Sequence, residues 1–200
     1  MFIFGHLGIG EAMVKPVGRT LPRRWLLLGT ILPDLIDKPL YYGLRFATGL
    51  HGAELGLISG TRTFGHTGLF LLILAGIAWA KRSRVFAALA LGVATHLLLD
   101  GLADIWIPYE PGTRTLVNAL FFPFMGFAFP VIPYHYVGEH LRSIMRPMTW
   151  MCEILGLLMF SWENWKRRHS SEIIAALAEH RHRLRLRRSK LREQRRGKSP

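Results

Sequence analysis

Cysteine is almost missing from this chain of 200 residues, which contains only Cys152. A single cysteine cannot form an internal disulfide, and there is no cysteine cluster that could hold zinc through sulfur. Any metal site must therefore use histidine and carboxylate ligands. Acidic residues are also scarce, with 13 Asp and Glu against 26 Lys and Arg.

Three further features are lacking. The start of the chain, residues 1–10, is apolar but has no basic segment and is interrupted by His6, so we do not read it as a cleaved signal peptide. No internal repeat or low-complexity linker is present. Between His169 and Pro200 there is no aromatic residue that could stack on a base, which makes nucleic acid a poor candidate for a specific partner.

What the chain does have is an apolar body and a basic end. Half of its residues are hydrophobic and its mean hydropathy is +0.22, yet its net charge is +13. Residues 166–198 contain 13 Lys and Arg and three acidic residues, so most of the charge lies there. We therefore predict a membrane-embedded helical metal-site domain over residues 1–165. A basic amphipathic helix or tail follows over residues 166–200, with Ser170 or Ser171 as its N-cap.

Five apolar stretches favour an all-α fold, a polytopic helical membrane bundle. Residues 85–107 and 116–137 reach the ~20 residues that a helical span needs, residues 68–80 approach a thin span, and residues 25–35 and 148–165 are short or weak candidates. The turn at residues 81–84 carries three positive charges, so this turn and the basic tail should be cytoplasmic. Residues 106–112 should face the opposite side.

The turn at residues 81–84 also predicts a site. In an antiparallel helical hairpin, positions equidistant from the turn lie side by side, which places His66 level with Asp100. His96 and Asp100 are four residues apart, so they share one helical face and could hold one metal ion. His66, His96 and Asp100 are therefore predicted to converge.

Two other groups are candidate members of this site. Asp34 and Asp37 follow a short apolar helix, and His6 lies between glycines that allow close backbone approach. Ionisable residues within apolar segments are costly and usually functional, and a cation would let the carboxylates stay charged. The candidate metal ligands are thus His6, Asp34, Asp37, His66, His96 and Asp100.

Each candidate also has a purely structural interpretation. Asp34 could cap a helix or turn, and His66 could cap the next helix or lie at the membrane interface. His96 and Asp100 could simply hydrogen bond to each other. Asp104, one turn beyond Asp100, is better explained as a supporting or loop residue than as a ligand.

The ordered motifs give a family resemblance. They are His6 with Gly10, Leu-Pro-Asp-Leu-Ile-Asp at residues 32–37, Arg-Thr-Phe-Gly-His-Thr at 62–67 and Thr-His-Leu-Leu-Leu-Asp at 95–100. In these the chain resembles the inner-membrane-associated, metal-dependent hydrolase family, also described as LexA-binding. The resemblance implies a bacterial inner-membrane protein with a His/Asp metal centre, distantly similar to zinc-dependent phospholipase C and related nucleases. Where the family has a further His, this chain has Thr61.

The function expected from these features is metal-dependent hydrolysis at the membrane. Zinc is the first choice, because histidine is abundant among the candidates; Mn²⁺ or Mg²⁺ would suit an oxygen-rich subset. Asp37 or Asp34 would exchange a proton with a water molecule activated by the metal. The substrate would be an ester or phosphodiester of a lipid or another amphipathic molecule.

Two other functions are compatible with the sequence. The protein could be a non-enzymatic membrane anchor or scaffold, whose basic tail binds anionic lipid or a partner. It could also be a transporter, or a haem protein that uses His66 and His96, although the many aspartates argue against haem.

Overall fold

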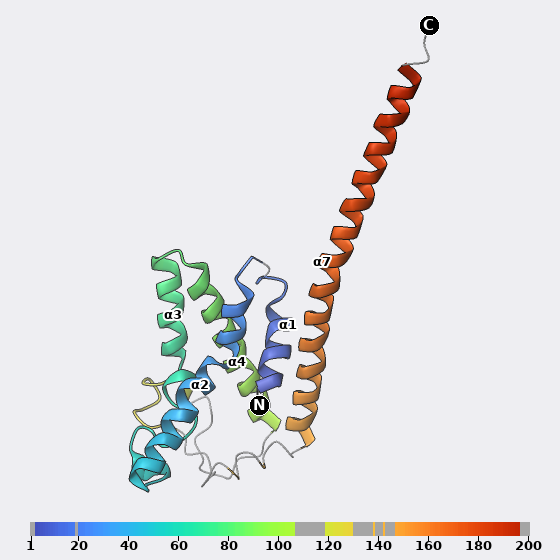
Figure 1. Ribbon diagram of the computed structural model, residues 1–200. Helices are drawn as coiled ribbons and strands as arrows, with labels where there is room; N and C mark the ends of the chain where they lie inside the picture. Colours follow the sequence, from blue (N-terminus) through green and yellow to red (C-terminus); the bar gives the residue numbers. More distant parts are fainter. Residues whose placement is uncertain are drawn as a thin grey trace. The chain divides into compact units, whose positions relative to one another are not determined.

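The computed structural model describes residues 3–18, 20–106, 119–129, 138, 142 and 147–196. These residues include helices and no strand, which confirms the all-α class for the described part of the chain. The chain divides into two compact units, Met1–Phe160 and Ser161–Pro200. Figure 1 shows the helices with their labels.

The first unit begins with a continuous helical run. It consists of the π-helix η1 (Gly5–Ile9) and the short helix α1 (Gly10–Val14). After a turn comes α2 (Arg23–Thr48), which ends at Gly49 in the left-handed conformation (φ 73°) that favours glycine. Two short 3₁₀ segments follow, η2 (Gly52–Leu55) and η3 (Phe64–His66).

The predicted hairpin around residues 81–84 is confirmed. Helix α3 (Gly68–Ala80) and helix α4 (Arg84–Trp106) lie side by side, joined by the basic turn (Figure 1). Thr67 caps α3, because its hydroxyl accepts a hydrogen bond from the backbone N–H of Phe70. Leu74 of α3 packs into a core with Val93 and Leu97 of α4.

Helix α2 corrects one expectation. We predicted that Asp34 and Asp37 follow a short apolar helix, but α2 continues through Pro33 and Pro39 to Thr48. A proline costs a helix one hydrogen bond and opens the preceding turn, without always ending the helix. Asp34 and Asp37 therefore lie inside a helix.

Two glycines bring α2 and α4 together. A Cβ atom on Gly29 would lie 2.5 Å from the carbonyl oxygen of Leu89, and one on Gly92 would lie 2.4 Å from that of Leu26. Only glycine allows the two backbones to come this close. Because Asp34 and His96 each lie about one turn beyond this contact, the crossing of α2 and α4 places them near each other.

The third glycine contact brings in the segment before α3. A Cβ atom on Gly65 would lie 2.9 Å from both the Cα and the carbonyl oxygen of Pro33. Gly65 therefore lets η3 lie directly against α2, and His66 follows it in the chain.

Helix α7 (Pro147–Arg196) corrects a second expectation. We predicted a new helix capped by Ser170 or Ser171, but the helix is continuous there, and the Ser170 hydroxyl donates a hydrogen bond to the carbonyl of Lys166. This bond one turn back satisfies the serine inside the helix. The boundary between the two compact units falls within α7, after Phe160.

Helix α3 has an unusual surface for a water-soluble protein. It is apolar on all sides, but among its large side chains only Leu74 is buried, while Leu69, Leu72, Ile73 and Trp79 are exposed. A helix that is apolar all round needs an apolar surrounding, either a protein core or lipid. The exposed side chains of α3 fit a lipid surrounding.

One helix in the described part of the chain, α4 over Arg84–Asp104, is long and apolar enough to cross a membrane, and α3 is apolar but shorter. Within the predicted span 116–137, the structure describes residues 119–129, where residues 119–120 are helical and turns follow. The rest of that span lies outside the described residues, and so does the connection at residues 107–112. Several membrane spans therefore remain a prediction.

Candidate metal centre

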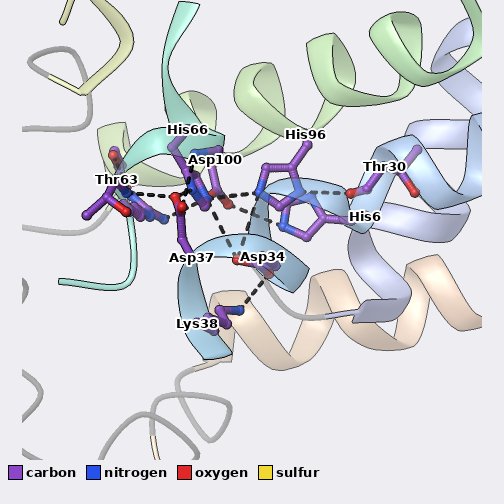
Figure 2. A network of polar contacts seen from close by, with 12 residues as sticks. His6, Thr30, Asp34, Asp37, Lys38, Thr63, His66, His96 and Asp100 are labelled. Carbon is purple, nitrogen blue, oxygen red and sulfur yellow. Dashed lines mark hydrogen bonds and ion pairs between the residues drawn. The ribbon is translucent and has the colours of Figure 1, made fainter. Parts of the chain in front are cut away.

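The structure brings all six sequence-predicted site residues together inside the first unit (Figure 2). They come from four elements: His6 from η1, Asp34 and Asp37 from α2, His66 from η3, and His96 and Asp100 from α4. The three histidines and Asp37 are fully buried, and Asp100 is 2 % exposed.

The Nδ1 atoms of His66 and His96 each have a hydrogen-bond partner. Nδ1 of His96 lies 2.8 Å from the carbonyl oxygen of Thr30, and Nδ1 of His66 lies 2.7 Å from Oδ2 of Asp37. A carbonyl oxygen can only accept, so Nδ1 of His96 must carry the hydrogen; the carboxylate of Asp37 favours the same tautomer in His66. In the neutral form of both rings, Nε2 is therefore left with a lone pair.

These two lone pairs face each other. The Nε2 atoms of His66 and His96 are 3.1 Å apart, and neither neutral ring has a hydrogen to place between them. Two buried acceptors at this distance repel each other unless a proton or a cation lies close by. The two Nε2 atoms therefore favour a proton or a metal cation beside them.

Two carboxylate oxygens complete the group. Oδ2 of Asp100 lies 3.6 Å from Nε2 of His66 and 3.7 Å from Nε2 of His96. Oδ1 of Asp34 lies 3.7 Å and 4.0 Å from the same two nitrogens. Four donors placed tetrahedrally about 2.1 Å from a zinc ion would be about 3.4 Å apart, so these spacings fit a zinc-sized cation.

His6 lies at the edge of this group. Its Nε2 is 3.3 Å from Oδ1 of Asp100, and its ring stacks on His96 with centroids 3.9 Å apart. Two sets of potential ligands overlap here, His6 with His96 and Asp100, and Asp34 with His66 and His96. Since only Nε2 of His96 is available, the two sets cannot each hold an ion through His96 at once, and the geometry fits one ion.

Asp37 lies behind His66 rather than at the centre. Besides His66 Nδ1, its carboxylate accepts hydrogen bonds from the backbone N–H groups of Thr63 (2.7 Å) and Gly65 (3.0 Å). Both of its oxygens are therefore engaged. The structure places Asp37 where it orients His66 and holds η3 against α2.

Two basic residues support the carboxylates, and our sequence reasoning did not identify either of them. Arg62 donates to both oxygens of Asp104 (2.8 and 2.9 Å) and lies 3.0 Å from Oδ2 of Asp100. Lys38 lies 2.6 Å from Oδ2 of Asp34. The four-residue spacing of Asp34 and Lys38 in a helix was a signal for the second pair. Arg62 belongs to a quoted motif, but nothing in the spacing paired it with Asp104.

Carboxylates are crowded at this site. Four of them (Asp34, Asp37, Asp100 and Asp104) lie around Lys38 and Arg62 in the part of the chain that the structure describes. Carboxylates held this close together disfavour one another's charged form unless positive charge lies among them. A divalent cation would add such charge.

His66 shows that positive charge is favoured at this position. Burial disfavours a charged imidazole, but the carboxylates of Asp100 and Asp37 outweigh burial and raise the pKa of His66 above its usual value. A proton on His66 Nε2 and a metal ion would use the same lone pair. The two should therefore compete.

One comparison with known proteins indicates the location. A family model described as YdjM inner membrane protein matches residues 1–178, which include every residue of the candidate site and much of α7. No curated protein and no solved structure matches the chain. The inner-membrane part of the resemblance noted above is thereby shown.

Proposed function

The protein belongs to the YdjM inner membrane protein family, and we propose that it is a metal-dependent hydrolase of the inner membrane. The observation that carries this proposal is the pair of imidazole lone pairs, His66 Nε2 and His96 Nε2, facing each other at 3.1 Å among carboxylate oxygens. Such a constellation is suited to a divalent cation.

The proposed ligands are His66, His96, Asp34 and Asp100, with His6 beside them. Imidazole and carboxylate donors at these spacings favour zinc, and Mn²⁺ or Mg²⁺ is the alternative for an oxygen-rich subset. Thr30 and Asp37 orient the two imidazoles from behind, as outer partners do in metal sites.

When bound, the ion would supply Lewis acidity and lower the pKa of a water molecule to about 7. The protein would supply the proton acceptor. The Asp34 side chain is 14 % exposed, whereas the Asp37 side chain is fully buried and accepts three hydrogen bonds. We therefore assign proton transfer to Asp34, which would leave His66, His96 and Asp100 to hold the ion while Asp34 carries the proton. We reassign Asp37, our other sequence candidate, to holding His66.

The membrane setting suggests the substrate class. The exposed apolar side chains of α3, Leu69, Leu72, Ile73 and Trp79, suit contact with acyl chains. We propose that the substrate is a lipid or another amphipathic molecule that reaches the site from the bilayer, and that the bond cleaved is an ester or a phosphodiester. In the proposed topology the chain spans the membrane several times and its basic tail is cytoplasmic.

Metal analysis tests the proposal directly. The protein would be purified in detergent without chelators, and its metal content measured for the wild type, His96→Ala, Asp100→Ala and the control His51→Ala. His51 is exposed and lies in the capping box of η2, an element that contributes none of the candidate ligands. We expect about one ion per wild-type or control chain and loss of that ion in the two site variants.

Turnover is measured on the same preparations. Fluorogenic phosphodiester and carboxylic ester substrates in mixed micelles should be cleaved by the wild type and the control alone. Equal metal content in all four proteins would contradict the metal site. If the two site variants lose the ion but the wild type cleaves no substrate, the protein has a metal centre and is not a hydrolase of these substrates.

A second function is favoured by the basic segment over residues 166–198, within which α7 continues as a helix to Arg196. We propose anionic lipid as its partner, because basic clusters near a membrane gain about 1 kcal/mol per charge from anionic lipid. Deletion of residues 169–200 separates the functions. An enzyme keeps metal and turnover, whereas an anchor loses binding to vesicles that contain phosphatidylglycerol.

A further inference from the structure

His6 has no hydrogen bond from a described residue that orients its ring, unlike His66 and His96. It is fully buried, and neither of its ring nitrogens makes a hydrogen bond to a described residue. His66 and His96, by contrast, are each fixed through Nδ1. The His6 ring is positioned by its backbone, by stacking on His96 and by the Asp100 carboxylate 3.3 Å from its Nε2.

The backbone of His6 is held by a residue from far along the chain. The carboxylate of Glu153 in α7 accepts hydrogen bonds from the N–H of Phe4 (2.9 Å, Oε2) and the N–H of Gly5 (3.1 Å, Oε1). The first N–H groups of a helix have no partner within the helix, and a carboxylate also suits the positive end of the helix dipole. Glu153 thus caps the helical run that carries His6, immediately before His6.

A glycine contact fixes α7 against the same run. A Cβ atom on Gly8 would lie 1.8 Å from the carbonyl oxygen of Gly156, and one on Gly156 would lie 2.1 Å from that of Phe4. Gly8 is two residues after His6, and Gly156 is nearly one turn after Glu153. The backbone is therefore held by α7 on both sides of His6.

We infer that α7 belongs to the metal centre and that Glu153 is the positioning residue of His6. This inference rests on the proposed function, because it gives His6 a part in holding the ion. It assigns a role to a segment outside the sequence motifs of the site, which all lie within the first 100 residues.

The test compares Glu153→Gln with a matched control, Glu163→Gln, on the same helix. A glutamine at position 153 keeps the size but presents an N–H donor to one of the two backbone N–H groups and removes the charge. Glu163 instead pairs with Arg167 and lies in the second unit. Zinc affinity is measured by competition with a chromophoric chelator in detergent.

We expect Glu153→Gln to weaken zinc binding about tenfold, which is the usual effect of losing an outer partner of a metal site. The control should bind like the wild type. In a His6→Ala background, Glu153→Gln should cause no further loss, because its effect passes through His6. The inference would be overturned if Glu153→Gln does not weaken zinc binding. It would also be overturned if Glu153→Gln weakens zinc binding further in the His6→Ala background.

A second readout does not require metal. Histidine-selective NMR of the metal-free protein should show shifted His6 ring signals in Glu153→Gln and unchanged His51 signals. If Glu153→Gln does not fold, Glu153→Asp replaces it, because aspartate keeps the charge but is too short to reach both N–H groups. A wild type that takes up no ion defeats the proposed function, while unchanged His6 signals defeat this inference.

Discussion

Asp37 and His66 form a buried pair in which one carboxylate fixes the tautomer of an imidazole and also ties two backbone segments together. Its Oδ2 is 2.7 Å from His66 Nδ1 and 2.7 Å from the N–H of Thr63. The ring can therefore turn only if its hydrogen bond to Asp37 breaks.

Asp37→Asn tests this pair. An asparagine can accept through one atom only and presents an N–H₂ group to the other donors, so His66 should lose its fixed orientation. We expect metal affinity to fall about 10- to 100-fold, measured by chelator competition. The control is His51→Ala, which leaves the centre intact, and an unchanged affinity in Asp37→Asn would show that Asp37 does not orient the ligand.

Arg62→Gln tests the support of the carboxylates. Removing the guanidinium leaves Asp100 and Asp104 buried with less compensation, and breaking a buried pair costs about 3–5 kcal/mol. We expect a lower melting temperature in the metal-free protein and partial recovery with zinc, because the cation replaces positive charge beside Asp100.

The measurement for Arg62→Gln is thermal unfolding in detergent, with and without zinc. Arg183→Gln is the matched control, because Arg183 pairs with Glu179 in an exposed part of α7. Its loss should lower the free energy of unfolding by less than about 1 kcal/mol. An equal loss of stability with and without zinc would contradict the placement of a cation beside Asp100.

The pH dependence of metal binding follows from the raised pKa of His66. In the metal-free protein a proton stays on His66 to a higher pH than on an ordinary histidine, and zinc must displace it. Apparent zinc affinity should therefore fall as the pH drops through this raised pKa, and binding should release protons into weakly buffered solution. Affinity that does not change between pH 8 and pH 6 would mean that proton and metal do not share the lone pair.

Gly92→Ala tests the crossing of α2 and α4. The new methyl group would meet the carbonyl oxygen of Leu26 at 2.4 Å, so the two helices must move apart. We expect a stability loss of about 1–3 kcal/mol. Metal binding should also weaken, because Asp34 and His96 both lie about one turn beyond this crossing.

Gly76→Ala in α3 is the control for Gly92→Ala. A Cβ atom there would meet nothing within 4 Å, so the change should be neutral or stabilise α3 by up to about 1 kcal/mol. Both variants are compared by thermal unfolding and zinc titration. Equal behaviour of the two alanines would contradict the role of the close contact.

The sequence predicted the part of the site that regular helix geometry determines. The basic turn at residues 81–84 set the register of α3 against α4, and the four-residue spacing put His96 and Asp100 on one face. These rules alone predict that His66, His96 and Asp100 lie together.

Other parts depend on contacts that spacing does not reveal. We expected the aspartates to follow a short helix, but α2 continues through Pro33, and this continuation puts Asp34 and Lys38 on one helix. Arg62 and Asp104 form a hydrogen bond although they are 42 residues apart in the chain, and Glu153 and Phe4 do so although they are 149 residues apart. Such pairs arise only when the helices have packed.

The distance along the chain between His6 and Glu153 has a consequence for biosynthesis. At the usual rate of about 5–20 residues per second, a ribosome needs several seconds to go from the last of the six candidate ligands, Asp100, to Glu153. During that time the N-terminal helix has no cap, while the histidines and aspartates are already made. Full assembly of the centre must therefore wait until α7 has been synthesised, so a chain truncated before residue 153 should be defective in metal retention even though it contains every candidate ligand.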